Sequence, residues 1–131
     1  MRRPFVAANW KMHKTVQEAV AYGHDFVARV EAVTDVDIVI APAFLALPAF
    51  VEATANSRIR VAGQNVHAEP HGAFTGEISL GMLQATGVTL VIIGHSERRH
   101  LFGETDGGVN TKTRATIDAG LTPIVCVGET L

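Results

Sequence analysis

Apolar and polar positions alternate in blocks along the chain rather than residue by residue. Five short, nearly continuous apolar runs rich in β-branched residues stand out: Phe5–Ala8, Asp37–Ala41, Ile59–Ala62, Leu90–Ile93 and Pro123–Val127. Such runs are typical of strands covered on both faces, as in a parallel sheet. Their starts are separated by roughly 30 residues, which is the length of one βαβ unit.

The segments between these runs carry helix signals. Thr15 and Glu18 have the spacing of a capping box, and an apolar stripe follows at helical spacing as far as Val30. Three further helices are predicted: around Leu47–Thr54 with Pro48 in its first turn, from a Ser79 cap to Gly87, and from an Asp106 cap to Ala119. The pattern therefore predicts four βα units followed by a fifth strand.

This alternation predicts an α/β fold in a single domain, residues 1–131. The chain has no Gly-rich dinucleotide fingerprint and no Walker A sequence, which favours a partial (β/α)8 barrel over a Rossmann sheet. A complete barrel has about 250 residues, so we expect a half-barrel of four βα units plus a fifth parallel strand. Its first and fifth strands should present unpaired edges, and its inward side chains should face water.

Composition and charge exclude several classes of protein. The chain has a net charge of −2 with 11 basic and 13 acidic residues, so it lacks the electrostatic signature of a nucleic-acid or membrane partner. Cys126 is the only cysteine, which excludes an intrachain disulfide and favours a reducing compartment. We see neither a signal peptide nor an apolar run that could cross a bilayer. These features predict a cytoplasmic location.

The most distinctive polar cluster follows the fourth apolar run. That run breaks at Gly94 and is followed directly by His95, Ser96, Glu97, Arg98 and Arg99. Polar residues also follow other runs: Asn9 and Lys11, Gln64 and Asn65, and Cys126 and Glu129. Because parallel strands joined by right-handed crossovers end at one rim, we expect these side chains to surround one small ligand. An ammonium and an amide suit an anionic substrate that bears a carbonyl.

Each of these residues also has a structural interpretation. Glu97 is either a structural ion-pair partner for Lys11 or a direct catalytic group, and a histidine at a strand end is often only a hydrogen-bonded surface residue. Arg98 and Arg99, together with Glu104, are better explained as a structural charge network than as substrate ligands. Cys126 lies in an apolar run, which favours a small core residue over a nucleophile.

Two further features lie between the third and fourth runs. His67 and His71 have i, i+4 spacing, but Pro70 separates them and the H-E-x-x-H order is absent, so no metal site is expected. A longer loop follows, with Phe74 and Thr75 near its tip. A loop of this kind is either mobile or docked into a partner.

Five segments, taken together in their order and spacing, resemble the triosephosphate isomerase family: Ala7–Met12, Gly63–Asn65, Gly72–Glu77, Gly94–Arg99 and Cys126–Glu129. The resemblance extends over the whole chain. It implies an isomerase that interconverts dihydroxyacetone phosphate and glyceraldehyde 3-phosphate through an enediolate, with no cofactor and no metal. The family is itself the standard example of a glutamate base paired with a neutral histidine electrophile.

The resemblance also implies roles for individual residues. His95 would be the neutral electrophile that polarises the carbonyl, and Lys11 the cation that binds the substrate and stabilises developing charge. Asn9 would be the hydrogen-bonding neighbour of Lys11 in substrate binding, and Glu97 the glutamate beside the lysine. Ser96 would be a rim residue that orients the site.

The remaining implications of the resemblance concern support and assembly. Gln64 and Cys126 would support the site from neighbouring strands. The loop carrying Phe74 and Thr75 resembles the family's dimer loop, which inserts beside the partner's active site. The expected partners are therefore a phosphorylated triose, for the full-length enzyme, and further copies of the chain in a homodimer or higher oligomer.

The family pattern continues beyond this chain. Family members carry their catalytic glutamate after a sixth strand, followed by a mobile lid and by phosphate-binding turns after the seventh and eighth strands. Glu129 matches a different family position, so the 131-residue chain is expected to be inactive alone. The alternative is a non-catalytic, self-associating half-barrel scaffold or folding fragment. An unrelated phosphate-binding barrel fragment would have to explain five coincident motifs.

Overall fold

The computed structural model describes residues 1–128 of the chain. In chain order the elements are β1 (Phe5–Asn9), α1 (Val16–Val30), β2 (Asp37–Ala41), the 3-10 helix η1 (Phe44–Ala46), α2 (Leu47–Ala53), β3 (Arg60–Gly63), α3 (Leu80–Ala85), β4 (Leu90–Ile93), α4 (Ser96–Phe102), α5 (Asp106–Asp118) and β5 (Thr122–Val125). Neighbouring strands pair in parallel, and their spatial order, β1-β2-β3-β4-β5, is the order of the chain. The predicted α/β partial barrel is thus confirmed.

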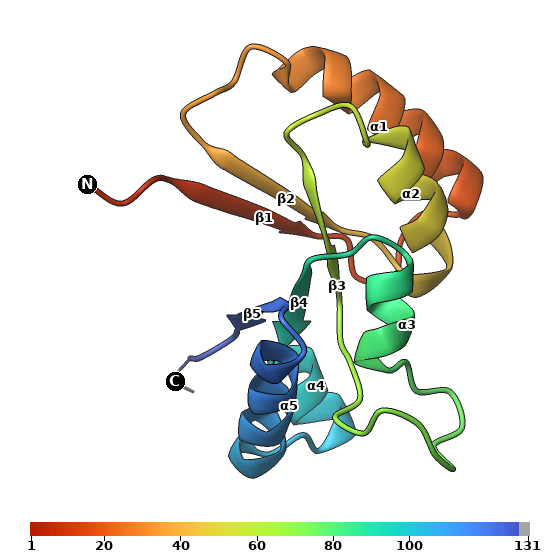
Figure 1. Ribbon diagram of the computed structural model, residues 1–131, viewed down its shortest axis with the longest axis vertical. Coiled ribbons are helices and arrows are strands. Elements are labelled where there is room, and N and C mark those ends of the chain that lie inside the picture. Colours follow the sequence, from red (N-terminus) through yellow and green to blue (C-terminus); the bar gives the residue numbers. More distant parts are fainter. Residues whose placement is uncertain (129–131) are drawn as a thin grey trace.

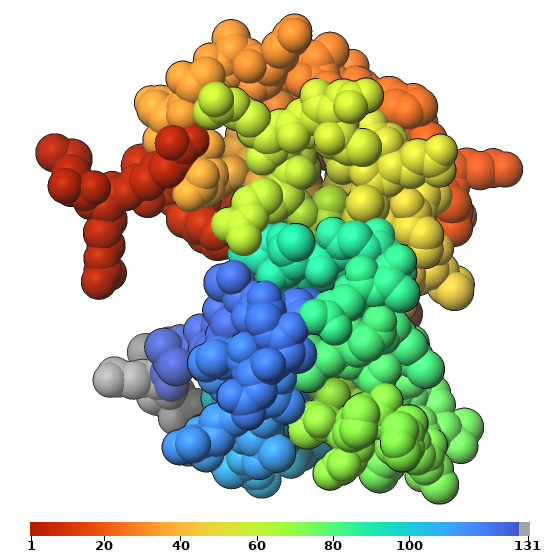
Figure 2. Space-filling model, in the orientation of Figure 1, coloured from red at the N-terminus to blue at the C-terminus, as the bar shows by residue number. Residues whose placement is uncertain are grey.

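The sheet curls into a half-barrel with its helices on the outer side (Figure 1). The N-terminus lies on the opposite, open side in that view. The space-filling view shows a hollow on this side, between the N-terminal residues in red and the C-terminal third in blue (Figure 2). The carboxyl ends of the strands therefore form one curved rim, on which the candidate site is built.

Two of the predicted helix caps are confirmed by their hydrogen bonds. The Thr15 hydroxyl accepts from the Glu18 amide at 3.3 Å, and the Glu18 carboxylate accepts from the Thr15 amide at 2.7 Å. This reciprocal pair satisfies two amides at the start of α1 that have no partner within the helix. Ser79 caps α3 by accepting from the Met82 amide at 3.2 Å.

The predicted cap of the last helix is wrong by one residue. The Thr105 hydroxyl, on an extended backbone, accepts from the Gly108 amide at 3.1 Å and so caps α5. Asp106 is instead the first residue of the helix, and its carboxylate bonds to the Arg99 guanidinium at 2.6 Å. The extended backbone that an N-cap requires is at Thr105, so Asp106 lies one position too far into the helix to cap it.

Helix α4 and the exact end of the last strand were not predicted. Residues 96–102, expected only as rim residues, form a helix that ends at Gly103 in the left-handed conformation, with φ of 68°. A glycine at this position is a common helix stop. Strand β5 ends at Val125, so Cys126 follows the strand instead of lying within it, although its amide still bonds to the Ile93 carbonyl at 2.8 Å.

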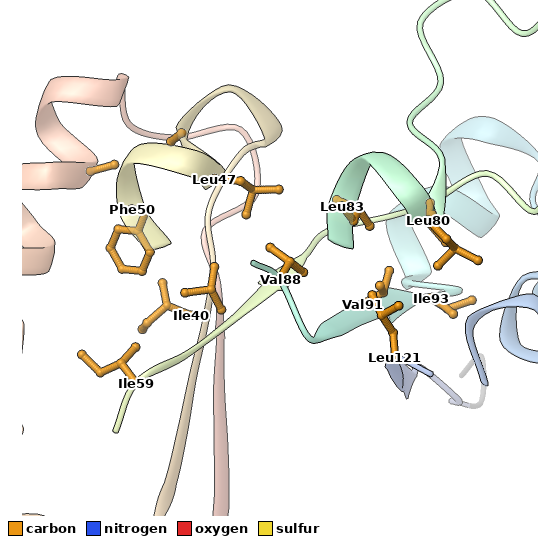
Figure 3. Close-up of a cluster of buried hydrophobic side chains, with 14 of the residues drawn as sticks. Ile40, Leu47, Phe50, Ile59, Leu80, Leu83, Val88, Val91, Ile93 and Leu121 are labelled. Carbon is orange, nitrogen blue, oxygen red and sulfur yellow. The ribbon is translucent and has the colours of Figure 1, made fainter. Parts of the chain in front are cut away.

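The main hydrophobic core lies between the sheet and the helices (Figure 3). Phe50 and Leu47 from α2, Leu83 from α3 and Ile40 from β2 are almost fully buried in it. The figure shows the cluster running from Phe50 and Ile59 at one end to Leu80 and Ile93 at the other. Burial of each large side chain of this kind stabilises the fold by about 1.5–3 kcal/mol, so the outer layer of helices is firmly attached.

The inward face of the sheet is less exposed than expected. Side chains from the three middle strands form a second buried cluster, at most 4% exposed, made of Val39, Ala41, Ala62, Leu90 and Ile92. Ile124 and Cys126 pack against it. The expectation that inward side chains face water is therefore wrong for these strands, because the curl of the sheet brings them into contact with one another.

Exposure is concentrated at the two edges of the sheet instead. In β1, Phe5 and Val6 are 45% and 57% exposed, and Val125 in β5 is 39% exposed. Within residues 1–128, β1 and β5 each pair with one strand only, as predicted. Among the same residues, no helix combines the length and apolar character needed to cross a membrane.

Candidate functional site

Three strand ends bring the predicted residues together on the rim. Asn9 ends β1 and Lys11 follows it, Gln64 follows β3, and His95 and Glu97 follow β4. All five line one cavity of about 260 Å³. Met12, Phe44, Asn65, Arg98 and Phe102 complete its lining. The expectation that these strands place an amide, an ammonium and an imidazole around one small space is confirmed.

Lys11 has a strained backbone that its neighbours hold in place. Its φ is 53°, in the left-handed region, which costs a non-glycine residue about 1–2 kcal/mol. The Lys11 amide donates to Asn9 Oδ1 at 2.9 Å, and Gln64 Nε2 donates to the Lys11 carbonyl at 2.8 Å. The same Gln64 amide nitrogen also donates to the Ala41 carbonyl at 2.9 Å. Asn9 and Gln64 thus fix the lysine backbone from both sides.

The Lys11 side chain pairs with Glu97. Its Nζ lies 2.8 Å from Glu97 Oε1, and both side chains are about half exposed. This hydrogen bond is the main reason that the pKa of Glu97 lies below its ordinary value. Burial opposes it, and the charges of Lys11 and His95 lower the pKa further. Exposed pairs contribute little to stability, so the main effect of the contact is to orient the ammonium.

His95 is held by a backbone hydrogen bond at the start of α4. Its Nδ1 accepts from the Glu97 amide at 3.2 Å, so His95 acts as the N-cap of that helix. A ring nitrogen that accepts an N–H carries no proton, so the proton of the neutral ring lies on Nε2. Glu97 Oε2 also lies 3.5 Å from Nδ1. Glu97 therefore contacts Lys11 through its carboxylate and His95 mainly through its amide.

Ser96 and Cys126 lie in a neighbouring cavity. This second cavity, of about 350 Å³, is also lined by His95, Arg99 and Gly128. His95 lines both of these cavities, whereas Lys11 lines the first and is not among the described residues that line the second. The sequence predicted one rim, and the structure divides it at His95. Glu129, which was also placed on the rim, lies outside the described residues.

Cys126 is half-buried and not poised to react. Burial raises the pKa of its thiol, and the nearby Arg99 charge offsets this only in part. A thiol with a raised pKa is a poor nucleophile at neutral pH. This agrees with the structural interpretation of the residue. Its contact with the inward cluster of the sheet gives it a packing role.

The predicted charge network is present in part: Arg98 pairs with Glu104, whereas Arg99 pairs with Asp106 instead, and the place of Arg99 is taken by Lys112, which the sequence did not predict. Arg98 and Lys112 each bond to Glu104 Oε2 at 3.0 Å, and the Glu104 side chain is only 7% exposed. Burial raises the pKa of Glu104, but hydrogen bonds from Lys112 and Arg98 outweigh it, so the net pKa is lowered. Lys112 Nζ also donates to Asn65 Oδ1 at 2.9 Å. The network thus ties α4 and α5 to the end of β3.

Lys112 could have been found from helix spacing. It lies three residues after Val109 and four before Thr116, and both of these are buried on the inner face of α5. That spacing places all three on one helix face. A lysine on a buried face needs a carboxylate partner, and Glu104 lies eight residues earlier in the chain.

The loop with Phe74 and Thr75 lies away from the first cavity. Both residues are exposed, and the Phe74 ring packs on the His67 imidazole with centroids 4.1 Å apart. The His67 amide bonds to the Ile78 carbonyl at 2.8 Å, which closes the base of the loop. Within residues 1–128, no three His, Cys, Asp or Glu side chains gather in a way that could hold a metal ion.

Comparison with known proteins identifies the fold and the family. The family model described as triosephosphate isomerase matches residues 4–131. The triosephosphate isomerase of Syntrophotalea carbinolica is 51% identical over 131 residues, which is all of this chain and 52% of that protein. The enzyme of Solibacter usitatus is 53% identical over the same length and 53% of its own chain.

A solved structure gives the same result. The crystal structure of triosephosphate isomerase from Bartonella henselae superimposes with a TM-score of 0.92 at 37% identity, and the match covers 98% of this chain and 53% of that one. The chain spans about half the length of the curated relatives that it matches. The family-model match, the relatives and the curled parallel sheet agree, and the chain belongs to the triosephosphate isomerase family.

Proposed function

We propose that this chain supplies the electrophilic part of a triosephosphate isomerase site. The reaction is the interconversion of dihydroxyacetone phosphate and glyceraldehyde 3-phosphate through an enediolate. The observation that carries the proposal is the shared cavity of Lys11, Asn9 and His95 at the carboxyl ends of the strands. A cation, an amide and an imidazole in one small space suit a phosphorylated carbonyl compound on which negative charge develops.

His95 is the proposed electrophile. Because its Nδ1 is occupied by the Glu97 amide, the protonated nitrogen of the neutral ring is Nε2. That N–H donates to the substrate carbonyl oxygen and polarises it, so that a proton on the adjacent carbon becomes easier to remove. A neutral imidazole is a weaker acid than imidazolium and lies closer in proton affinity to the enediolate.

Lys11 is the proposed electrostatic partner. Its ammonium binds the substrate anion and stabilises the enediolate oxygen, and Asn9 adds a hydrogen bond beside it. The contact with Glu97 orients the ammonium, and the backbone bonds to Asn9 and Gln64 maintain the conformation of Lys11 before substrate arrives. Such preorganisation is the main source of electrostatic catalysis in enzymes. Glu97 and Gln64 are thus proposed as positioning residues.

Ser96 and Cys126 are proposed to support the site from the second cavity. Ser96 is exposed at the start of α4, directly after His95, and its hydroxyl would orient a group that enters the second cavity. Cys126 fills space beneath the rim. Neither residue is proposed to react with the substrate.

We also propose that residues 1–131 form a single half-barrel unit that has no isomerase activity by itself. Of the described residues that line the first cavity, Glu97 is the only carboxylate, and it is engaged by Lys11. Absence of a positioned general base alone lowers the rate by about 10²–10⁴-fold. A turnover number for the isolated chain equal to that of a relative such as the Syntrophotalea carbinolica enzyme would contradict this.

The function is tested by complementation. The chain is mixed with the second half of the Syntrophotalea carbinolica enzyme, and triose phosphate isomerisation is followed in a coupled assay. Activity should appear only in the mixture. His95→Gln and Lys11→Met should each lower it by at least about 100-fold, whereas His24→Gln, on the exposed side of α1, should leave it unchanged. Activity that survives both site substitutions would refute the assignment.

Self-association is the proposed assembly. The exposed edges of β1 and β5 are routes to pairing between chains, and Phe74 and Thr75 form an exposed loop of the kind that docks beside a partner's site. Sedimentation velocity should show a dimer or a larger species that shifts toward monomer in Phe74→Ser or Val6→Lys. A single monomeric species over a wide range of concentrations would refute the proposal.

A further inference from the structure

The loop between β1 and α1 contains two lysines in the left-handed region of the backbone. Lys11 has φ of 53° and Lys14 has φ of 73°. Glycine adopts such angles without strain, but lysine does not. The Lys11 conformation is explained by the hydrogen bonds to Asn9 and Gln64. A different interaction accompanies Lys14, and it involves aromatic rings.

The Lys14 ammonium lies over two aromatic side chains. Its Nζ is 5.4 Å from the ring centroid of Trp10 and 5.3 Å from that of Tyr22. The two rings meet edge to face, with centroids 5.0 Å apart and an angle of 87° between their planes. A cation within about 6 Å of a ring centroid is attracted by the negative face of the ring, most strongly for tryptophan. Lys14 therefore folds back onto the residue that begins its own loop.

Trp10 is itself fixed in the fold. Its amide bonds to the Ala41 carbonyl of β2 at 3.1 Å, and its ring meets that of Phe50 in α2 at 5.2 Å. Trp10 and Lys14 are the two ends of a five-residue segment with Lys11 in it. Because one end is anchored, the contact between Lys14 and Trp10 restrains the other end and closes the segment.

We propose that Lys14 is a positioning residue, whose ammonium clamps onto Trp10 and Tyr22 and so holds the loop that places Lys11 against Glu97. The effect of this clamp on catalysis rests on the proposed isomerase function. Its effect on the position of Lys11 does not depend on that function. Lys14 itself is not among the residues that line the Lys11 cavity, so its effect on the site is transmitted through the loop.

The test uses nuclear magnetic resonance on the 131-residue chain, without any turnover. Two quantities report on Lys11: the pKa of the Glu97 carboxyl group, which the Lys11 ammonium lowers, and the hydrogen exchange rate of the Lys11 amide. Lys14→Met should raise the Glu97 pKa toward its ordinary value and speed exchange at Lys11 by about threefold. Lys14→Arg, which keeps a cation able to stack on the rings, should restore both to wild-type values.

A second variant separates the charge from the backbone. Lys14→Gly adopts φ of 73° without strain, so it preserves the path of the loop while removing the ammonium, and it should behave like Lys14→Met. Arg114→Met removes a distant surface cation on α5 and should change neither quantity. The proposal is overturned if Lys14→Gly leaves both quantities at wild-type values, or if Lys14→Arg behaves like Lys14→Met. Because the readouts need no catalysis, failure of the isomerase assay would leave this test intact.

Discussion

The amide of Glu97 donates to Nδ1 of His95 across 3.2 Å, while the carboxylate of the same glutamate holds Lys11. One residue thus touches both groups proposed to polarise the substrate. The two contacts use different parts of Glu97, its backbone for His95 and its side chain for Lys11. They can therefore be separated by substitution, since a change of side chain at position 97 removes the Lys11 contact and leaves the backbone amide in place.

The first prediction concerns the titration of Glu97. Its pKa in the folded chain should lie below the ordinary value of about 4.3, and Lys11→Met should raise it toward that value. Because the folded-state pKa is lowered, the pair stabilises the fold above the ordinary pKa, and this contribution disappears as the pH falls through the folded-state pKa. Carbon-13 NMR of the Glu97 carboxyl group measures the pKa. An identical pKa in Lys11→Met would contradict the prediction.

The second prediction concerns the buried network around Glu104. Lys112→Met leaves the carboxylate, whose side chain is only 7% exposed, with Arg98 as its remaining cation. We expect unfolding by urea at pH 7 to require about 3 kcal/mol less free energy in this variant. Arg114→Met, on the same helix but bonded to Asn110 on the surface, should change it by at most about 0.5 kcal/mol.

The same network predicts a dependence on pH. The net pKa of Glu104 is lowered in the folded chain, so the unfolded chain binds the proton more readily. Stability from this group is complete above its ordinary pKa of about 4.3 and is lost as the pH falls through the lower folded-state pKa. Urea unfolding at a series of pH values should show that acidification lowers the free energy of unfolding by less in Lys112→Met than in the wild-type chain. The same dependence of this free energy on pH in both chains would contradict the proposed pairing.

The third prediction compares two glycines with nearly the same backbone. Gly94 has φ of 72°, and a Cβ there would lie 2.8 Å from the Val109 side chain. Gly103 has φ of 68°, and its Cβ would meet nothing within 4 Å. Gly103→Ala should destabilise the chain by about 1 kcal/mol from backbone strain, and Gly94→Ala by about 2–4 kcal/mol because overpacking adds to it. Equal losses in thermal unfolding would show that Val109 moves aside freely.

The fourth prediction tests the core beneath α3. Leu83 is 1% exposed, and its neighbour Met82 is 57% exposed. Leu83→Ala should lower the free energy of unfolding by about 2–5 kcal/mol because it leaves a cavity. Met82→Ala, in the same helix, should lower the free energy of unfolding by less than about 1 kcal/mol. Comparable losses in the two variants would mean that the outer helices contribute little to the core.

The sequence predicted the strands and the site better than the connections between them. Continuous apolar runs located the five strands to within about two residues, because burial on both faces leaves little room for polar residues. The residues after β1, β3 and β4 were correctly expected on one rim. The split of that rim at His95 could not be predicted, because it depends on how α4 packs beside the strand ends.

The errors have physical causes in tertiary structure. The helix after His95 is only seven residues long and charged, so no apolar stripe marks it. Thr105 rather than Asp106 caps α5 because the extended backbone is at Thr105, and the Asp106 carboxylate binds Arg99, seven residues earlier in the chain. The exposure of the inward face was overestimated because spacing gives the direction of a side chain but not the curvature of the sheet. Each error concerns a feature that the local pattern of apolar and polar residues does not contain.

The identity between strand order and chain order has a consequence for biosynthesis. Each strand pairs with the one made just before it, so every new βα unit adds to an edge that already exists. The paired residues are 21 to 32 positions apart in the sequence, so each pairing needs only the crossover of its own βα unit. A ribosome that releases the chain from its N-terminus therefore delivers the strands in the order in which the sheet accepts them, and the most recently added strand is always the one left open for the next.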